Sequence, residues 1–339
     1  MNIISLLIIV IFNLFFYLNL KYISNKIGIF DYPDNLRKNH DKAIPPIGGI
    51  AIFFSLILFI IINILFGKIE ILSDFYYVTN QVNYKSVFSF FCCLILLLVI
   101  GILDDKNGVS ANLRLLFFGL IFYFSILLDD QLILKSLNFQ TLNIVIDLDR
   151  VGVFFTICCF LVLINSLNMF DGINIQSGLY LLILFLILAY KKIFFNISIP
   201  IIISLIFFLY YNYKNKIFIG NHGIYFLSFI LSFLVIKNYN TSNFVTVEEV
   251  FLLFYLPILE LSRLFITRLY KNKNPFKGDS NHIHHYLNRK IKNLTLTALL
   301  TNIISFSPFV FFSIYQSFYI LIFTTIFYFL LIIVIRKKI

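Results

Sequence analysis

The chain is built from long apolar stretches separated by short polar connections. Stretches such as residues 2–20 and 314–335 hold about 20 mostly apolar residues, the length that crosses a bilayer as a helix. The pattern predicts an all-α polytopic membrane protein with about eleven transmembrane helices, in a single domain over residues 1–339. The predicted spans are about 2–20, 45–66, 85–103, 112–128, 151–165, 175–190, 194–212, 222–236, 247–266, 294–313 and 314–335.

Composition agrees with this pattern, because 60% of the residues are hydrophobic and only 13% are charged. Soluble domains carry about 25% charged residues, so composition excludes a water-soluble fold. The first stretch has no basic residue before Lys21. It lacks the positive segment of a cleavable signal peptide, so we expect it to remain as the first span.

The basic residues are distributed unevenly along the chain. Of the 27 lysines and arginines, 20 fall in connections that follow odd-numbered spans or in the C-terminal tail. The positive-inside rule then predicts an external N-terminus and a cytoplasmic C-terminus, in a bacterial plasma (inner) membrane. Topology and anionic lipid headgroups account for the net charge of +11, so it does not require a nucleic-acid partner.

Unusual polar residues gather on the predicted cytoplasmic side. Asp104 and Asp105 are adjacent at the inner end of the third span, and Asp171 follows the fifth span, near Asn168. Acidic residues this close to hydrocarbon are costly and mark candidate functional sites. Adjacent carboxylates also suit Mg²⁺, which binds a few carboxylates together with phosphate oxygens and water. Solvated span ends and a polar turn are the alternatives.

Three of the five histidines, His282, His284 and His285, lie within four positions. The zinc-protease pattern H-E-x-x-H is absent, since no glutamate lies between them. Basic residues flank the cluster on both sides, which favours anion binding over metal ligation or an incidental cluster. Carboxylates, carboxamides and a cationic loop at one membrane face are typical of phosphoryl transfer between a lipidic and a soluble substrate.

Five stretches in chain order resemble motifs of the polyprenyl-phosphate N-acetylhexosamine-1-phosphate transferases, of the glycosyltransferase family 4 type. DYPDNLRKNHDKAIPPIGG (31–49) resembles D-x-P-x-x-R-K-x-H followed by P-x-x-G-G, and GILDDKNGVSANLRL (101–115) resembles D-D-x-x-G-L-S-x-x-x-K/R-L. NSLNMFDGIN (165–174) resembles N-x-x-N-x-x-D-G-I-D, and PILELSRLF (257–265) resembles P-x-x-D-x-x-R. PFKGDSNHIHHYL (275–287) resembles P-F-x-x-D-x-x-H-x-H-H-x-L, the form closer to the branch with simple N-acetylhexosamine donors.

The resemblance implies an enzyme that transfers N-acetylhexosamine-1-phosphate from a UDP-sugar to undecaprenyl phosphate and releases UMP. It implies a role in starting cell-wall or lipopolysaccharide glycans at the cytoplasmic face, with Mg²⁺, or Mn²⁺, as cofactor. By this resemblance the catalytic residues are Asp104, Asp105 and Asp171, with Asp104 polarising or deprotonating the lipid phosphate. The metal ligands are Asp105, Asp171 and Asn221. The substrate-binding residues are His282, His284, His285, Asn168, Arg114, Arg263 and His40.

The chain departs from the family pattern at three acidic positions. Asn174 and Asn221 stand where the family usually has aspartate, and Glu260 replaces a third aspartate. We expect an active variant, because the aspartate pair and the histidine cluster are intact. The alternatives are a catalytically inactive relative that binds lipid phosphate or partner glycosyltransferases, and a membrane transporter, which would carry its acids near the bilayer midplane. The sequence leaves the oligomeric state open, with a homodimer as one option.

Overall fold

The computed structural model describes residues 3–33, 42–67, 75, 83–241, 245–275 and 281–336. The chain forms two compact units: unit 1 comprises Met1–Asp130 and Gly178–Leu234, and unit 2 comprises Gln131–Ser177 and Val235–Ile339. Two of the three boundaries fall inside helices α7 (Gln176–Tyr190) and α9 (Gly220–Thr241), and the third falls in the short 3-10 helix Asp130–Leu132. The single-domain organisation therefore stays a prediction.

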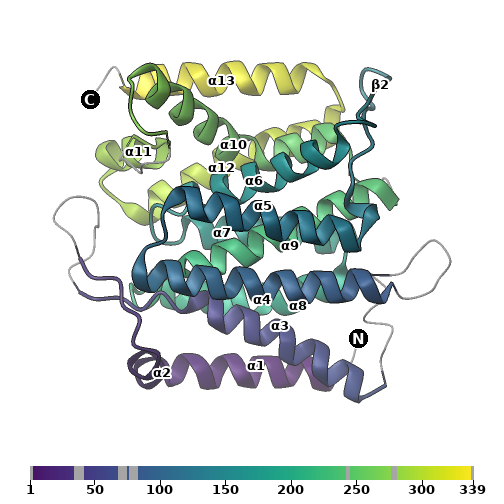
Figure 1. Cartoon of the computed structure of the whole chain (residues 1–339). Helices are drawn as coiled ribbons and strands as arrows, with labels where there is room; N and C mark the ends of the chain where they lie inside the picture. The colour runs from purple at the N-terminus through teal and green to yellow at the C-terminus, as the bar shows by residue number, and fades with distance from the viewer. Residues whose placement is uncertain are drawn as a thin grey trace. The chain divides into compact units, whose positions relative to one another are not determined.

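Every predicted span within the described residues is helical (Figure 1). The further helices of unit 1 are α1 (Ile3–Leu18), α2 (Leu20–Ile27), α3 (Gly48–Leu65), α4 (Tyr84–Asn107), α5 (Ala111–Leu128) and α8 (Phe195–Tyr213). The further helices of unit 2 are α6 (Gly152–Phe170), α10 (Val247–Tyr270), α11 (Ile283–Ile291), α12 (Leu294–Tyr315) and α13 (Tyr319–Arg336).

The long apolar helices make the chain a polytopic, mainly α-helical membrane protein. Nine helices in the described part of the chain are long and apolar enough to span a bilayer, or ten when α1 and α2 count as one span bent by 73°. Helix α7, which occupies the sixth predicted span, has only 15 residues. The count of eleven spans is therefore not confirmed.

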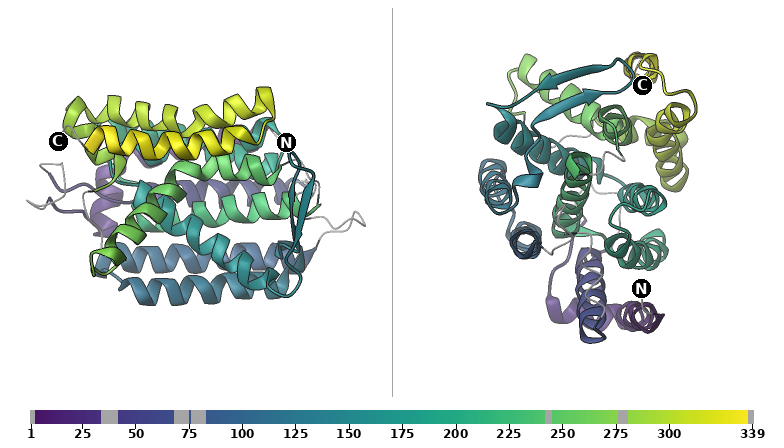
Figure 2. Two further views of the ribbon diagram at one scale, coloured as in Figure 1. Left: turned by 90° about the horizontal axis from the view of Figure 1, so that it is seen from above. Right: turned by 90° about the vertical axis from the view of Figure 1, so that its right-hand side faces the viewer.

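One element departs from the all-α prediction. Strands β1 (Ser136–Phe139) and β2 (Ile144–Asp147) form an antiparallel hairpin in the connection between α5 and α6, drawn as two arrows in the right-hand view of Figure 2. Its register pairs Ser136 with Asp147 and Phe139 with Ile144. The buried carboxylate of Glu248, in the first turn of α10, accepts hydrogen bonds from the backbone N–H (3.0 Å) and hydroxyl (2.9 Å) of Thr141. This contact fixes the hairpin on α10.

In unit 1, helices α1, α3 and α8 pack against one another around a ring of buried polar side chains. Asn13 donates to Ser55 Oγ (2.9 Å), Ser55 donates to Ser204 Oγ (3.3 Å), and Ser204 donates to Asn13 Oδ1 (2.8 Å). Hydrogen bonds between helices satisfy polar groups that lipid cannot. The ring therefore fixes how these three helices align.

In unit 2, helix α10 packs against both α6 and α12. It begins with a capping box in which Thr246 and Glu249 each bond the other's backbone N–H (3.1 Å in both directions). Helix α11 packs on α12 and α13, which positions the histidine cluster at the end of the long helices of unit 2.

Candidate active site

The predicted aspartate pair lies in the last turn of α4 because of how that helix ends. Gly108 follows Asn107 with φ of 69°, a left-handed conformation that favours glycine, and its N–H bonds the carbonyl oxygen of Asp104. The side chain of Ser110 then caps α5 by accepting from the N–H of Leu113. This tight connection brings the first turn of α5 beside the two aspartates.

Asp104 is held at both carboxylate oxygens and is only 7% exposed. Oδ1 accepts from the backbone N–H of Val109 (2.6 Å), and Oδ2 accepts from Arg114 Nη1 (2.9 Å) and the Tyr225 hydroxyl (2.6 Å). Arg114 Nη1 also donates to the Tyr225 hydroxyl (3.1 Å). The Nε and Nη2 edge of Arg114 makes no hydrogen bond to any described residue, so it can meet an anion such as a phosphate.

Asp105 faces the N-terminus of α9 instead. Its Oδ1 accepts from the backbone N–H of Asn221 (2.9 Å), and its Oδ2 lies 2.6 Å from Nδ1 and 3.4 Å from the backbone nitrogen of His222. Among the described residues, no lysine or arginine bonds Asp105, whereas Asp104 is paired with Arg114. The two adjacent aspartates therefore differ in their partners: Asp104 is paired with Arg114, and Asp105 is bonded by the imidazole of His222 and by backbone N–H groups.

The histidine cluster of unit 2 surrounds the start of α11. His282 precedes the helix as its N-cap residue, and His284 and His285 lie in its first turn. Ring centroids are 5.2 Å apart for His282 and His284 and 4.4 Å apart for His284 and His285. His282 and His284 are buried and His285 is half-buried, so the three rings form one packed group.

Glu260 and Arg263 support this cluster from α10. Arg263 binds Glu260 through two hydrogen bonds, and its Nη2 also donates to the carbonyl oxygen of Asn281 (2.7 Å). Glu260 accepts the N–H of Ile283 (3.0 Å), the first residue of α11, and the hydroxyl of Tyr328 from α13. Arg263, predicted to bind substrate, thus holds the backbone that carries the histidines.

His284 also packs on the segment that follows α6. A Cβ at Gly172 would lie 2.0 Å from His284 Nε2, so only glycine fits there. Gln176 Nε2 lies 3.3 Å from His284 Nδ1, which places the ring proton on Nε2 if the amide donates. Burial, followed by the neighbouring His282 and His285, holds the pKa of His284 well below its usual range. At neutral pH, His284 is therefore an uncharged hydrogen-bond donor.

The other predicted residues of unit 2 lie at the end of α6. Asp171, half-buried, follows the helix directly and accepts a hydrogen bond from the Ser177 hydroxyl. Asn168, also half-buried, lies in the last turn of α6. Gly172, directly after Asp171, contacts the ring of His284, so unit 2 brings Asp171 near the histidines although they lie far apart along the chain. His40 lies outside the described residues.

Several side chains outside the predicted site residues hold the predicted ones. His222 bonds Asp105, Tyr225 bonds Asp104, and Tyr328 bonds Glu260. The sequence does give a signal for His222, because it directly follows Asn221, a predicted metal ligand. Tyr225 and Tyr328 lie in apolar spans, where a hydroxyl among many aromatic residues is not distinctive.

The oxygen-rich side chains fit a hard divalent cation. No group of three or more His, Cys, Asp or Glu side chains that could hold a metal ion occurs in the described ranges. Mg²⁺ does not require one, because it binds one or two carboxylates and completes its shell with phosphate oxygens and water. Asp105 and Asn221 are neighbours in unit 1, and Asp171 offers a half-buried carboxylate in unit 2.

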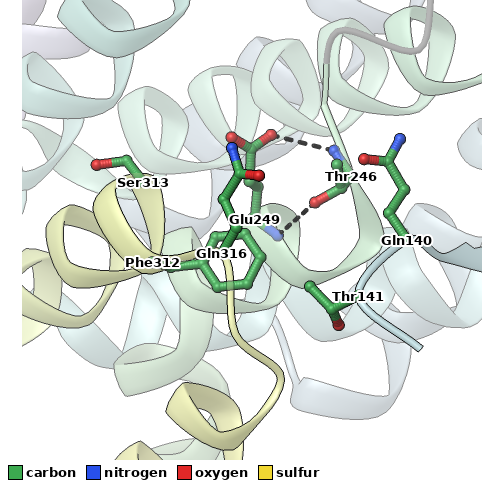
Figure 3. Close-up of a pocket in the computed structure, with 7 residues that line it drawn as sticks. All are labelled: Gln140, Thr141, Thr246, Glu249, Phe312, Ser313 and Gln316. Atoms are coloured by element: carbon green, nitrogen blue, oxygen red, sulfur yellow. Dashed lines mark hydrogen bonds between the residues drawn. The ribbon is translucent and has the colours of Figure 1, made fainter. Parts of the chain in front are cut away.

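A pocket of about 340 Å³ opens elsewhere in unit 2 (Figure 3). It lies beside the hairpin turn, the capping box of α10 and the C-terminal end of α12. Its lining residues are Gln140, Thr141, Thr246, Glu249, Phe312, Ser313 and Gln316. No predicted site residue lines it, so it is separate from the candidate site.

Residues 87–239 match the family model described as glycosyl transferase family 4. The chain is 29% identical over 276 residues to a probable undecaprenyl-phosphate N-acetylglucosaminyl 1-phosphate transferase of Bacillus subtilis, covering 79% of this chain and 72% of that protein. It is 28% identical to the undecaprenyl-phosphate alpha-N-acetylglucosaminyl 1-phosphate transferase of Thermotoga maritima (80% of this chain, 77% of that protein). The Escherichia coli K12 protein with the same description is 24% identical over 300 residues, covering 84% of this chain and 76% of that protein.

The long apolar helices make the chain a polytopic membrane protein, and the relatives to which it is similar are described as transferases. Residues 87–239 are similar to glycosyl transferase family 4, the family whose motifs the sequence resembles.

Proposed function

We propose that this chain transfers N-acetylhexosamine-1-phosphate from a UDP-N-acetylhexosamine to undecaprenyl phosphate. An oxygen of the lipid phosphate forms a bond to the sugar-bearing phosphorus of the donor. The bond from that phosphorus to the bridging oxygen breaks, and UMP leaves with this oxygen. The product is a diphosphate-linked glycolipid that starts a cell-envelope glycan. The names of the relatives, undecaprenyl-phosphate N-acetylglucosaminyl 1-phosphate transferases, support the lipid acceptor and the sugar-1-phosphate group.

The observation that carries this proposal is the contrast between the two adjacent aspartates. Asp104 fixes one side of Arg114 and leaves its other edge for a phosphate, while Asp105 presents a carboxylate that no described lysine or arginine bonds. A site for phosphoryl transfer needs both features, because catalysis consists mainly of positioning and charge neutralisation. A transporter would not require this arrangement at a helix end.

In the proposed roles, Asp104 orients Arg114, whose open edge binds the lipid phosphate. Asp105, Asp171 and Asn221 hold Mg²⁺, or Mn²⁺, which when bound supplies charge stabilisation for the phosphates. In unit 2, His282, His284 and His285 bind the donor diphosphate, and Asn168 with Asp171 contributes to nucleotide binding. Arg263 acts through the histidine backbone, and His40 keeps its predicted role in substrate binding.

The proposed topology has eleven spans, with the N-terminus outside and the C-terminus in the cytoplasm of a bacterial inner membrane. In this topology the bent pair of α1 and α2 counts as one span, and the short helix α7 counts as another. A bent span and a short span are both tolerated where neighbouring helices shield them. A homodimer stays a prediction, testable by the mass of the purified protein in detergent.

The deciding experiment uses the purified full chain with undecaprenyl phosphate, Mg²⁺ and a panel of UDP-sugars, and measures UMP release together with the lipid product. We expect one UDP-N-acetylhexosamine to yield equal amounts of UMP and glycolipid. No release with any donor, from protein that still binds undecaprenyl phosphate, would instead support the catalytically inactive alternative.

A further inference from the structure

His222 is a fully buried histidine in direct contact with Asp105. Its Nδ1 lies 2.6 Å from Asp105 Oδ2, and its side chain has no exposed surface. Since a carboxylate only accepts hydrogen bonds, Nδ1 must carry the proton in this contact. The second ring nitrogen, Nε2, is buried without a hydrogen-bond partner among the described residues. Burying an imidazole with one unsatisfied nitrogen costs free energy. The structure tolerates this cost at a ring that bonds Asp105, so the role of that bond requires an explanation.

Three glycines from three segments of unit 1 make room for His222. A Cβ at Gly49 would lie 2.8 Å from His222 Cδ2, and a Cβ at Gly220 would lie 2.5 Å from His222 Cε1. A Cβ at Gly101, on α4 one turn before Asp105, would lie 2.1 Å from the Cα of His222. The imidazole therefore occupies a socket that fixes its position, and a fixed ring can fix the carboxylate it bonds.

Without the imidazole, Asp105 would be weakly oriented. The carboxylate of an aspartate rotates in a broad, shallow torsional well. Within the part of the chain that the structure describes, only the N–H of Asn221 (2.9 Å) and the distant N–H of His222 (3.4 Å) bond it besides His222 Nδ1. One good backbone bond holds one oxygen, and the imidazole holds the other.

Asn221 contributes to the same arrangement. Its backbone N–H bonds Asp105 Oδ1, so the first turn of α9 holds one carboxylate oxygen while the ring of His222 holds the other.

We propose that His222 is a positioning residue that sets the orientation of the Asp105 carboxylate. This inference rests on the proposed function, because it treats Asp105 as part of the reaction site. His222 itself does not contact substrate in this proposal. Loss of the imidazole lowers kcat and leaves the donor KM nearly unchanged, because the ground-state contacts of the donor lie elsewhere.

Three variants test this proposal. His222→Phe fills the socket without a hydrogen bond, and His222→Asn retains an N–H at the position of Nδ1. Ser228→Ala is the matched control, since Ser228 is buried on α9 and its hydroxyl bonds, among the described residues, only the carbonyl oxygen of Ile224. We expect His222→Phe to lose roughly 10- to 100-fold in kcat, the cost of a misplaced reacting group, with KM changed less than about threefold. His222→Asn should recover most of the loss, and Ser228→Ala should match wild type.

Hydrogen exchange of the backbone amide of Asn221 supplies a readout that does not depend on turnover. We expect faster exchange of this amide in His222→Phe, and wild-type exchange in His222→Asn and Ser228→Ala. Wild-type kcat and exchange in His222→Phe would overturn the proposal, as would equal losses in His222→Phe and Ser228→Ala. Absence of UMP release from wild type, with the expected exchange pattern intact, would reject the proposed function and retain the positioning contact.

Discussion

Arg263 binds Glu260 through two nearly parallel hydrogen bonds, from Nε to Oε1 (3.1 Å) and from Nη2 to Oε2 (3.0 Å). The two side chains lie one turn apart on α10 and are almost completely buried. Glu260 also accepts the first N–H of α11, so the pair links α10 to the start of the histidine cluster. The ion pair therefore controls where the histidines lie.

Arg263→Lys should weaken donor use and stability together. Lysine keeps the charge but cannot form both hydrogen bonds to Glu260. Removing one partner of a buried ion pair costs about 3–5 kcal/mol of stability, which is the upper limit for this substitution. We expect a donor KM raised by roughly tenfold, the effect of about 1.4 kcal/mol, and a lower unfolding temperature. Arg150→Lys, at an exposed arginine of unit 2, is the control and should change neither. An unchanged donor KM in Arg263→Lys would show that the ion pair has no effect on donor binding.

Asp104→Asn and Asp105→Asn should each abolish most turnover while the protein stays folded. Asp104→Asn removes the charge that orients Arg114, and Asp105→Asn removes the carboxylate that no described lysine or arginine bonds. Loss of one preorganised charged group typically costs about 100- to 1,000-fold in kcat. UMP release and size-exclusion profiles measure the two effects. Asp149→Asn, at an exposed aspartate, should behave as wild type; wild-type turnover in either site variant would refute these roles.

The buried state of His284 predicts a pH-dependent stability. Its folded-state pKa lies well below the unfolded value of about 6.5, so below that pH the unfolded chain binds a proton that the folded chain does not. The free energy of unfolding should therefore fall as the pH drops from about 6.5 toward 5. Thermal unfolding followed by circular dichroism would show this fall, and His284→Gln, which cannot take up the proton, should reduce it. Parallel pH profiles for the two proteins would contradict the prediction.

Asn221→Asp should lower the Mg²⁺ concentration for half-maximal activity. An amide oxygen brings no charge, and the affinity of hard cations rises with the number of carboxylates. Wild type should use Mn²⁺ better than a protein with aspartate there, since Mn²⁺ accepts neutral ligands more readily. Metal titrations of both proteins test this, with Asn143→Asp in the exposed hairpin turn as the charge control. Identical curves would place residue 221 outside the metal shell.

Single cysteines at exposed positions should report the proposed topology. Asn143 lies in the hairpin turn on the proposed outer side, and Lys292 follows α11 on the proposed cytoplasmic side. We expect a membrane-impermeant maleimide to label Asn143→Cys in intact spheroplasts and to label Lys292→Cys only after lysis. Wild type, with its own cysteines buried or half-buried, serves as the background control. The reverse labelling pattern would overturn the orientation.

Hydrophobic patterning predicted the helices well, but their ends depend on local chemistry. The predicted span 85–103 appears as α4, Tyr84–Asn107, because the helix continues past the aspartates to the left-handed residue Gly108. The hairpin escaped prediction because β2 is exposed along its whole length and so lacks an alternation of buried and exposed positions.

The motifs predicted which residues matter but not which of them touch. Asp105 and His222 are separated by 117 positions, and no periodicity relates them. Gly172 and His284 belong to different motifs, yet a side chain at position 172 would overlap the imidazole ring of His284. Arg263 matched a motif, while its contacts with Glu260 and Asn281 became visible only in three dimensions.

The polar ring formed by Asn13, Ser55 and Ser204 bears on how the protein is made. Ser204, which donates to Oδ1 of Asn13, is synthesised 191 residues after it. The first helix therefore enters the lipid before the partner for that oxygen exists, and an unsatisfied polar group in hydrocarbon is unfavourable. Closure of the ring is thus a late step of biogenesis, reached only after α8 has been inserted, and it distinguishes a completed unit 1 from a partly translated one.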